Sequence, residues 1–215
     1  NKETARDVAR KSMVLLKNDG GILPLSGRER IALIGPFADN GEEMLGAWPG
    51  FGEGDSTVTF LTGLKARFPK AQIMSCEGSK ALERIPGGVA DAVRVARSSD
   101  VVLMAVGLPN KCSGEATSLA SLDLPQPQKE LFDAVAATGK PVVMLLVTGR
   151  GMTIADETEK AKALLVTWHP GTMAGPALAD VLSGDHNPSG RLTISFPYET
   201  GQLPMRYNHK NTGCL

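Results

Sequence analysis

The sequence predicts an α/β fold, a three-layer sandwich with a mostly parallel sheet of about five or six strands. One observation is a series of short, continuous Val/Ile/Leu-rich runs, which are typical of strands buried on both faces. A second is that stretches with helical spacing of apolar residues separate most of these runs. The sequence also has no internal repeat and no boundary that divides it into two cores, so we expect a single α/β sandwich domain over residues 1–215.

The N-terminal quarter predicts a helix, a strand and a long loop. Apolar residues recur at i, i+3 and i+4 over residues 4–18, which predicts a helix with Thr4 as its N-cap. The apolar run 31–34 ends at a Gly-Pro pair and predicts a buried strand. Residues 39–57 are rich in Gly, Asp and Glu, and we expect them to form a loop.

Helix and strand signals alternate through the middle of the chain. The pattern predicts a short helix over 58–68 and a strand over 71–75. A helix over 87–97 then precedes the apolar strand 101–106. A further helix is expected over 128–138.

The C-terminal third continues the alternation and then becomes rich in Pro and Gly. The run 142–147 predicts a central strand, and the run 163–167 predicts the next one. A helix is expected over 173–182, and Gly184 ends it. Residues 192–196 predict one strand at the edge of the sheet.

Composition excludes several classes of protein. Lys plus Arg equals Asp plus Glu at 23 each, so no basic surface predicts binding to nucleic acid. No apolar run approaches the roughly 20 residues that a membrane-spanning helix needs, and no signal peptide is visible. The cysteines Cys76, Cys112 and Cys214 show no zinc-ligand spacing, so we expect ordinary reduced thiols and no metal site.

Glu115 is the first candidate for a functional side chain. It lies in the segment 113–116, on the loop that follows the predicted strand 101–106. Open α/β sheets place their functional groups on loops that leave the C-terminal ends of parallel strands. A solvated loop glutamate with no chemical role is the alternative interpretation.

Two tryptophans lie on predicted loops after strands. Trp48 is in a Gly-rich loop, where an indole could pack on the C–H face of a sugar ring, or could instead cover the domain's own core. Trp168 precedes His169, which we expect to hydrogen-bond a neighbouring loop.

The sequence contains no GxGxxG, GxxxxGK[ST] or GxSxG motif, which disfavours a nucleotide-binding domain and an α/β-hydrolase triad.

Several segments resemble the second domain of glycoside hydrolase family three. The resemblance extends over essentially the whole chain, and its most specific part is the Gly-Asp-His-Asn-Pro-Ser-Gly segment 184–190. The segments that carry it are 12–19, 31–40, 139–149, 169–172, 179–191, 195–197 and 207–213.

The resemblance implies a flavodoxin-like sandwich domain of a retaining β-glycosidase that is similar to β-glucosidases. In that family a (β/α)₈ barrel carries an aspartate nucleophile, and the sandwich supplies the general acid/base on a loop. Glu115 matches the acid/base position, and Ser113 and Trp48 are expected to contact the substrate. The implied partners are a β-linked glucoside or oligosaccharide and the barrel, which this sequence does not contain, with no metal or organic cofactor. The resemblance also implies a periplasmic or secreted parent protein.

The chain departs from the family pattern around the implied acid/base. Relatives often carry a glutamate where this chain has Leu108, and an arginine and an aspartate where it has Leu119 and Ser121. The two kinds of loss have opposite electrostatic effects on a nearby carboxyl group. Two hypotheses therefore remain: a catalytic domain that uses Glu115, and a structural or carbohydrate-contacting module that has lost the acid/base role. In either case we expect no glycosidase activity from the isolated chain.

Overall fold

Six strands form one sheet in the order β1-β6-β5-β4-β2-β3 in the computed structural model, which describes residues 1–206, 208 and 210. Five strands are parallel, and β1 runs antiparallel to β6 at one edge. Counted among themselves, the parallel strands follow the flavodoxin-like order 2-1-3-4-5, which confirms the predicted fold class. The strands are β1 (Val14–Asn18), β2 (Arg30–Ile34), β3 (Gln72–Cys76), β4 (Val101–Gly107), β5 (Val142–Val147) and β6 (Ala163–Val166).

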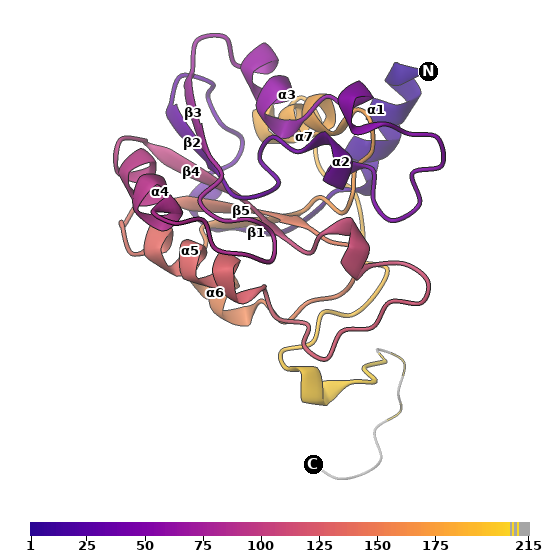
Figure 1. The fold of residues 1–215 in the computed structure, drawn as a ribbon. Helices are drawn as coiled ribbons and strands as arrows, with labels where there is room; N and C mark the ends of the chain where they lie inside the picture. The colour runs from indigo at the N-terminus through magenta and orange to yellow at the C-terminus, as the bar shows by residue number, and fades with distance from the viewer. Residues whose placement is uncertain (207, 209, 211–215) are drawn as a thin grey trace.

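Helices cover both faces of this sheet (Figure 1). Helices α1, α3 and α7 lie on one face, and α4, α5 and α6 lie on the other. Each face therefore has its own apolar core, and β4 and β5 between the two cores are buried along their whole length. The helices are α1 (Lys2–Ser12), α2 (Gly41–Met44), α3 (Phe60–Arg67), α4 (Gly88–Arg97), α5 (Gln126–Ala136), α6 (Ala155–Lys160) and α7 (Ala174–Ser183).

Two glycines let α3 and α7 meet backbone to backbone. A Cβ atom built on Gly63 of α3 would lie 2.1 Å from the carbonyl carbon of Gly175 at the start of α7. A Cβ on Gly175 would lie 2.0 Å from the carbonyl oxygen of Thr59. A side chain at either position would therefore force the two helices apart.

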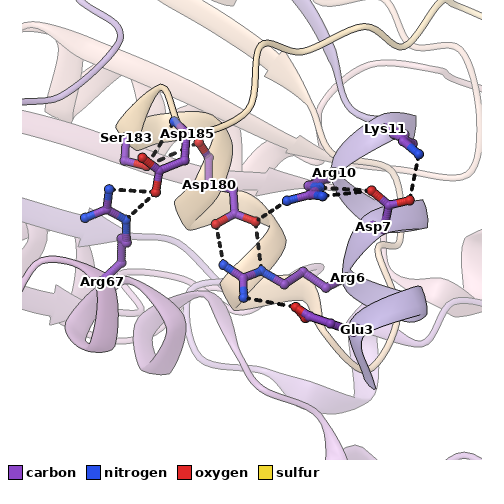
Figure 2. Close-up of polar contacts among 9 residues, drawn as sticks. All are labelled: Glu3, Arg6, Asp7, Arg10, Lys11, Arg67, Asp180, Ser183 and Asp185. Atoms are coloured by element: carbon purple, nitrogen blue, oxygen red, sulfur yellow. Dashed lines mark hydrogen bonds and ion pairs between the residues drawn. The ribbon is translucent and has the colours of Figure 1, made fainter. Parts of the chain in front are cut away.

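A buried carboxylate joins α1 to α7 (Figure 2). The Asp180 side chain is 2 % exposed and accepts hydrogen bonds from Arg6 and Arg10 of α1. Asp185, just beyond α7, forms a more exposed ion pair with Arg67 of α3. The network fixes the N-terminal helix on the face that α7 also covers.

The predicted helix 4–18 is wrong beyond residue 12. Helix α1 begins at Lys2 with Asn1 as N-cap, and Met13 has extended φ and ψ angles. The next residues form β1, which pairs Val14 with Val166 and contains an irregularity near Leu16. An apolar run of this length fits either a helix turn or a strand, and pairing with the free edge of β6 decides for the strand.

Three further elements differ from the sequence predictions. The predicted loop 39–57 contains the short helix α2, which Asn40 caps by accepting from the backbone N–H of Glu43. Residues 192–196 form no strand; Leu192 and Phe196 instead pack as irregular chain against the second core. Helix α6 was not predicted, because its six residues are short and mostly charged or polar. The motif residues 207, 209 and 211–213 and also Cys214 lie outside the described residues.

No helix among the described residues is both long enough and apolar enough to cross a membrane.

Candidate active site

The loops that follow β2, β4, β5 and β6 meet at the C-terminal edge of the parallel strands. Backbone and side-chain hydrogen bonds join them: Gly171 after β6 donates to the carbonyl of Met44 after β2, 2.8 Å away. Arg150 after β5 donates to Cys112 after β4. Crevices at this edge are where doubly wound sheets bind ligands, so the position of Glu115 agrees with its assignment as a candidate.

Glu115 lies at the turn of the loop after β4. The residue is exposed, and it forms no ion pair or side-chain hydrogen bond with any other described residue. Its neighbours bend the chain sharply, since Gly114 has φ of 97° and Ala116 has φ of 59°. Both values are in the left-handed region, which glycine adopts freely and alanine does not. The Glu115 carboxyl group is therefore free to meet a ligand.

Trp48 lies beside the same loop. A Cβ built on Gly114 would lie 3.4 Å from the indole Nε1 of Trp48 and 3.0 Å from the Cβ of Ala47. The Trp48 side chain is nevertheless 72 % exposed, so it does not cover the domain's own core. The structure thus brings together two of the three predicted site residues through the Gly114 contact.

Ser113, the third predicted residue, is 8 % exposed. A Cβ built on Gly149 would lie 2.6 Å from the Ser113 hydroxyl oxygen, so this loop packs directly on the turn after β5. The hydroxyl group has no hydrogen-bond partner among the described residues. A contact between Ser113 and substrate stays a prediction.

Arg150 connects the two ends of the turn that carries Glu115. Its Nε donates to the carbonyl oxygen of Cys112 at 2.7 Å, and its Nη2 donates to the carbonyl oxygen of Thr117 at 2.9 Å. The Nη2 group also donates to the Thr117 hydroxyl at 2.7 Å. That hydroxyl in turn donates to the carbonyl oxygen of Gly114 at 2.8 Å.

Glu43 and His169 form a second connection behind the loops. The Glu43 carboxylate accepts a hydrogen bond from the backbone N–H of Asn110, and the Glu43 carbonyl accepts one from His169 Nδ1 at 2.8 Å. Burial raises the pKa of the Glu43 carboxyl, and the Asn110 bond partly opposes it. Burial likewise lowers the pKa of His169. The neutral His169 side chain therefore joins the loop after β6 to the segment after β2 by a hydrogen bond, as its sequence context predicts.

The Trp168 side chain is used for contacts within the domain. Its indole Nε1 donates to the carbonyl oxygen of Ser12 at 3.1 Å, and its ring meets Phe196 edge to face with centroids 6.2 Å apart. It therefore offers no free aromatic face comparable to that of Trp48.

The residues that depart from the family pattern are absorbed into the fold. Leu108 is buried, Leu119 packs against the second core, and the Ser121 hydroxyl donates to Asp123. A hollow of about 680 Å³ lies beside this loop, lined in part by Leu108 and Leu119, but neither Glu115 nor Trp48 lines it. The candidate acid and the candidate aromatic platform thus stand on an open surface.

Sequence reasoning missed Arg150 and Glu43. A signal for Arg150 existed: it follows the central strand β5 by three residues, so it had to reach the same sheet edge as Glu115. Glu43 had no such signal, because it is one of several acidic residues in a sequence segment without helical or strand periodicity.

Among the described residues, no group of three or more His, Cys, Asp or Glu side chains could hold a metal ion. Cys76 and Cys112 are both free and partly buried.

Comparison with known families gives one match that covers nearly the whole chain. Residues 13–213 match the model of the glycosyl hydrolase family 3 C-terminal domain.

Curated relatives and solved structures agree with this match. The chain is 40 % identical to a periplasmic beta-glucosidase of Salmonella typhimurium, over 99 % of its own length and 31 % of the relative's. It is 37 % identical to a beta-xylosidase of Formosa agariphila, over 96 % of its length and 30 % of the relative's. The beta-glucosidase of Listeria innocua, solved with glucose and, as a mutant, with laminaribiose, superposes with a TM-score of 0.91 at 40 % identity, covering 98 % of this chain and 29 % of that one. The chain thus spans about a third of the length of the relatives that it matches.

Proposed function

Because the chain belongs to the glycosyl hydrolase family 3 C-terminal domain family, we propose that it is the sandwich domain of a retaining β-glycosidase with Glu115 as general acid/base. The substrate class is a β-linked glucoside or oligosaccharide. The names of the relatives, beta-glucosidase and beta-xylosidase, support this class. The periplasmic relative supports a periplasmic or secreted parent protein.

One observation carries the proposal: Glu115 is an exposed carboxyl group, without a side-chain partner among the residues that the structure describes, on a tightly bound turn at the C-terminal ends of the parallel strands. A solvated glutamate without a role would not need a turn with two left-handed residues and an arginine bridging its ends. Trp48 beside this turn offers an exposed aromatic face, which suits the C–H face of a sugar ring at a leaving-group subsite.

The chemistry follows from the geometry that retaining hydrolysis requires. A carboxylate attacks the anomeric carbon, the glycosidic C–O bond breaks, and Glu115 gives its proton to the leaving oxygen. Glu115 then takes a proton from water as that water attacks the glycosyl–enzyme ester and releases the first carboxylate. The two carboxyl groups must lie about 5–5.5 Å apart for this double displacement.

The second carboxylate belongs, in this proposal, to a (β/α)₈ barrel elsewhere in the parent protein. The chain spans about a third of its relatives, which leaves room for such a domain in proteins of their length. The open surface around Glu115 and Trp48 also fits a cleft that a second domain completes.

Replacing the proposed acid/base in the full-length protein tests this function. We expect Glu115→Gln to lower kcat for an alkyl β-glucoside by about 100- to 10,000-fold, the range that general acid catalysis supplies. A dinitrophenyl β-glucoside, whose leaving group needs no proton, should retain fast glycosylation, and azide should restore turnover by replacing water. Steady-state kinetics with both substrates, with and without azide, measure this.

Glu159→Gln is the matched control, since Glu159 is an exposed glutamate near the end of α6. The chain continues from there into the N-terminal end of β6, so Glu159 lies away from the C-terminal strand ends that carry the candidate site. It should leave kcat unchanged. Equal kinetics for Glu115→Gln and the unmodified enzyme would instead support the alternative, a structural or carbohydrate-contacting module without the acid/base role.

A further inference from the structure

We propose that Arg150 is a positioning residue that holds the turn of Glu115 in the geometry for proton transfer. This inference rests on the function proposed above, and it assigns a role to a side chain that does not itself touch the substrate.

Arg150 closes the turn from both ends at once. Four residues, 113–116, separate its two backbone acceptors, the carbonyl oxygens of Cys112 and Thr117. The Thr117 hydroxyl extends the contact, because it accepts from Arg150 and donates to the carbonyl of Gly114. The residue before Glu115 and the residues flanking the turn are therefore all tied, directly or through Thr117, to one guanidinium group.

Arg150 is itself held in place by Thr148, which directly follows β5. The Thr148 hydroxyl is fully buried; it accepts from the backbone N–H of Arg150 at 3.0 Å and donates to its carbonyl at 2.9 Å. Gly149 between them packs on Ser113, where a Cβ would come within 2.6 Å of the hydroxyl oxygen. The backbone of Arg150 is thus tied to Thr148, the buried residue that directly follows the central strand β5.

The partners of Arg150 distinguish it from the arginines that serve as ion pairs. Arg6, Arg30 and Arg84 each bind a carboxylate, whereas Arg150 donates only to uncharged oxygens among the described residues. A guanidinium group is planar and presents donors in a fixed fork, so it can bridge two carbonyls that a lysine ammonium cannot bridge in the same way.

Positioning matters here because the strained turn would relax without its bridge. Ala116 has a φ of 59°, which a residue with a Cβ adopts only when its surroundings impose it. General acid catalysis needs the donor within hydrogen-bond reach of the leaving oxygen. Relaxation of the turn would move Glu115 out of that reach while leaving the nucleophile unaffected.

The test compares Arg150→Met and Arg150→Lys with Glu115→Gln in the full-length enzyme. We expect Arg150→Met to lower kcat by about 10- to 100-fold for an alkyl β-glucoside, part of the range that general acid catalysis supplies. It should lower kcat by less than about 3-fold for a dinitrophenyl β-glucoside, which needs no proton donor, with little change in KM. Arg150→Lys should show the same selectivity, because the charge remains and the bridge is lost. Added methylguanidine should partly restore an Arg150→Ala variant.

Amide hydrogen exchange over residues 113–117 gives a readout that does not depend on activity. Exchange should accelerate in the Arg150 variants and stay unchanged in Arg191→Met. That variant is the matched control because Arg191, like Arg150, donates to backbone carbonyls, those of Ser189 and Gly190, and binds no carboxylate among the described residues.

The outcomes separate the two proposals. If Glu115→Gln depends on the leaving group but the Arg150 variants slow both substrates equally, or neither, the positioning role is overturned and the proposed function stands. If Glu115→Gln has no effect, the proposed function fails, and the catalytic role of Arg150 fails with it. Unchanged exchange in Arg150→Lys overturns the bridge itself, whatever the kinetics of the Met variant.

Discussion

Burial shifts the pKa values of His169 and Glu43, which hydrogen-bond to each other, and Glu43 also accepts a hydrogen bond from the loop after β4. The pKa of His169 is lowered by burial, so the folded chain holds fewer protons at this position than the unfolded chain below about pH 6.5. The stability that neutral His169 supports is present above that pH and is lost as the pH falls towards the folded pKa. The Glu43 carboxyl has a raised pKa and opposes this trend, because the stability that its neutral form contributes is fully present below about pH 4.5 and is lost as the pH rises towards the folded pKa.

We therefore expect His169→Gln to flatten the pH dependence of stability. Each unit by which burial lowers the histidine pKa corresponds to about 1.4 kcal/mol that the unmodified protein loses on acidification. Thermal unfolding between pH 7.5 and 4.5, a range that includes the ordinary pKa values of both groups, measures the difference between the two proteins. Glu43→Gln is the companion variant and should make the loss on acidification steeper; identical slopes for all three proteins would contradict this account.

Sequence reasoning could predict single residues of the candidate site where one local pattern sufficed. Glu115 was predicted because a carboxylate follows a buried strand, and Trp48 because a tryptophan stands in a Gly-rich loop. Arg150 was not predicted, because its role depends on the register that sets the end of β5 beside the end of β4, where Gly107 pairs with Val147. That adjacency is a property of the assembled sheet.

At the scale of elements, Asp180 determines how firmly α1 is held. The carboxylate is almost fully buried and binds two arginines of α1, so its neutral isostere leaves a guanidinium group without its charged partner. We expect Asp180→Asn to lower the free energy of unfolding by about 2 kcal/mol, comparable to the loss of a charged hydrogen bond. Urea denaturation followed by circular dichroism measures it.

Asp185→Asn supplies the comparison, because Asp185 lies just past α7 and its side chain is 52 % exposed in its pair with Arg67. An exposed pair of this kind contributes about 1 kcal/mol or less. Equal losses in the two variants would show that burial does not strengthen the contact between α1 and α7.

Helix and strand boundaries were predictable in proportion to their burial. The central runs β4 and β5 were predicted within about one residue, since strands buried on both faces have no polar alternation to confuse them. The change from α1 to β1 at Met13 was not, because its apolar residues satisfy helical spacing until β6 offers them a partner. The strand predicted over residues 192–196 was wrong for the opposite reason. Apolar side chains of this segment pack against the core, but its backbone pairs with no strand.

At the scale of the whole molecule, the proposed division of labour predicts that this chain is inactive by itself. The proposal places the nucleophilic carboxylate in another domain, and a lone proton donor cannot form the glycosyl intermediate. We expect no turnover of an aryl β-glucoside by the purified 215-residue chain, whereas a protein containing the barrel should turn it over. Robust hydrolysis by the chain alone, surviving Glu115→Gln, would contradict both the mechanism and the site.

The antiparallel placement of β1 also bears on how the chain folds as it is made. It pairs with β6, which is synthesised only after β1 and the four strands β2 to β5 that lie between them in the sequence. Closing so long a segment costs conformational entropy, so we expect β1 to join the sheet after the parallel strands have paired. A nascent chain stalled before β6 would expose β1 as an apolar segment without a partner, the kind of intermediate that chaperones bind.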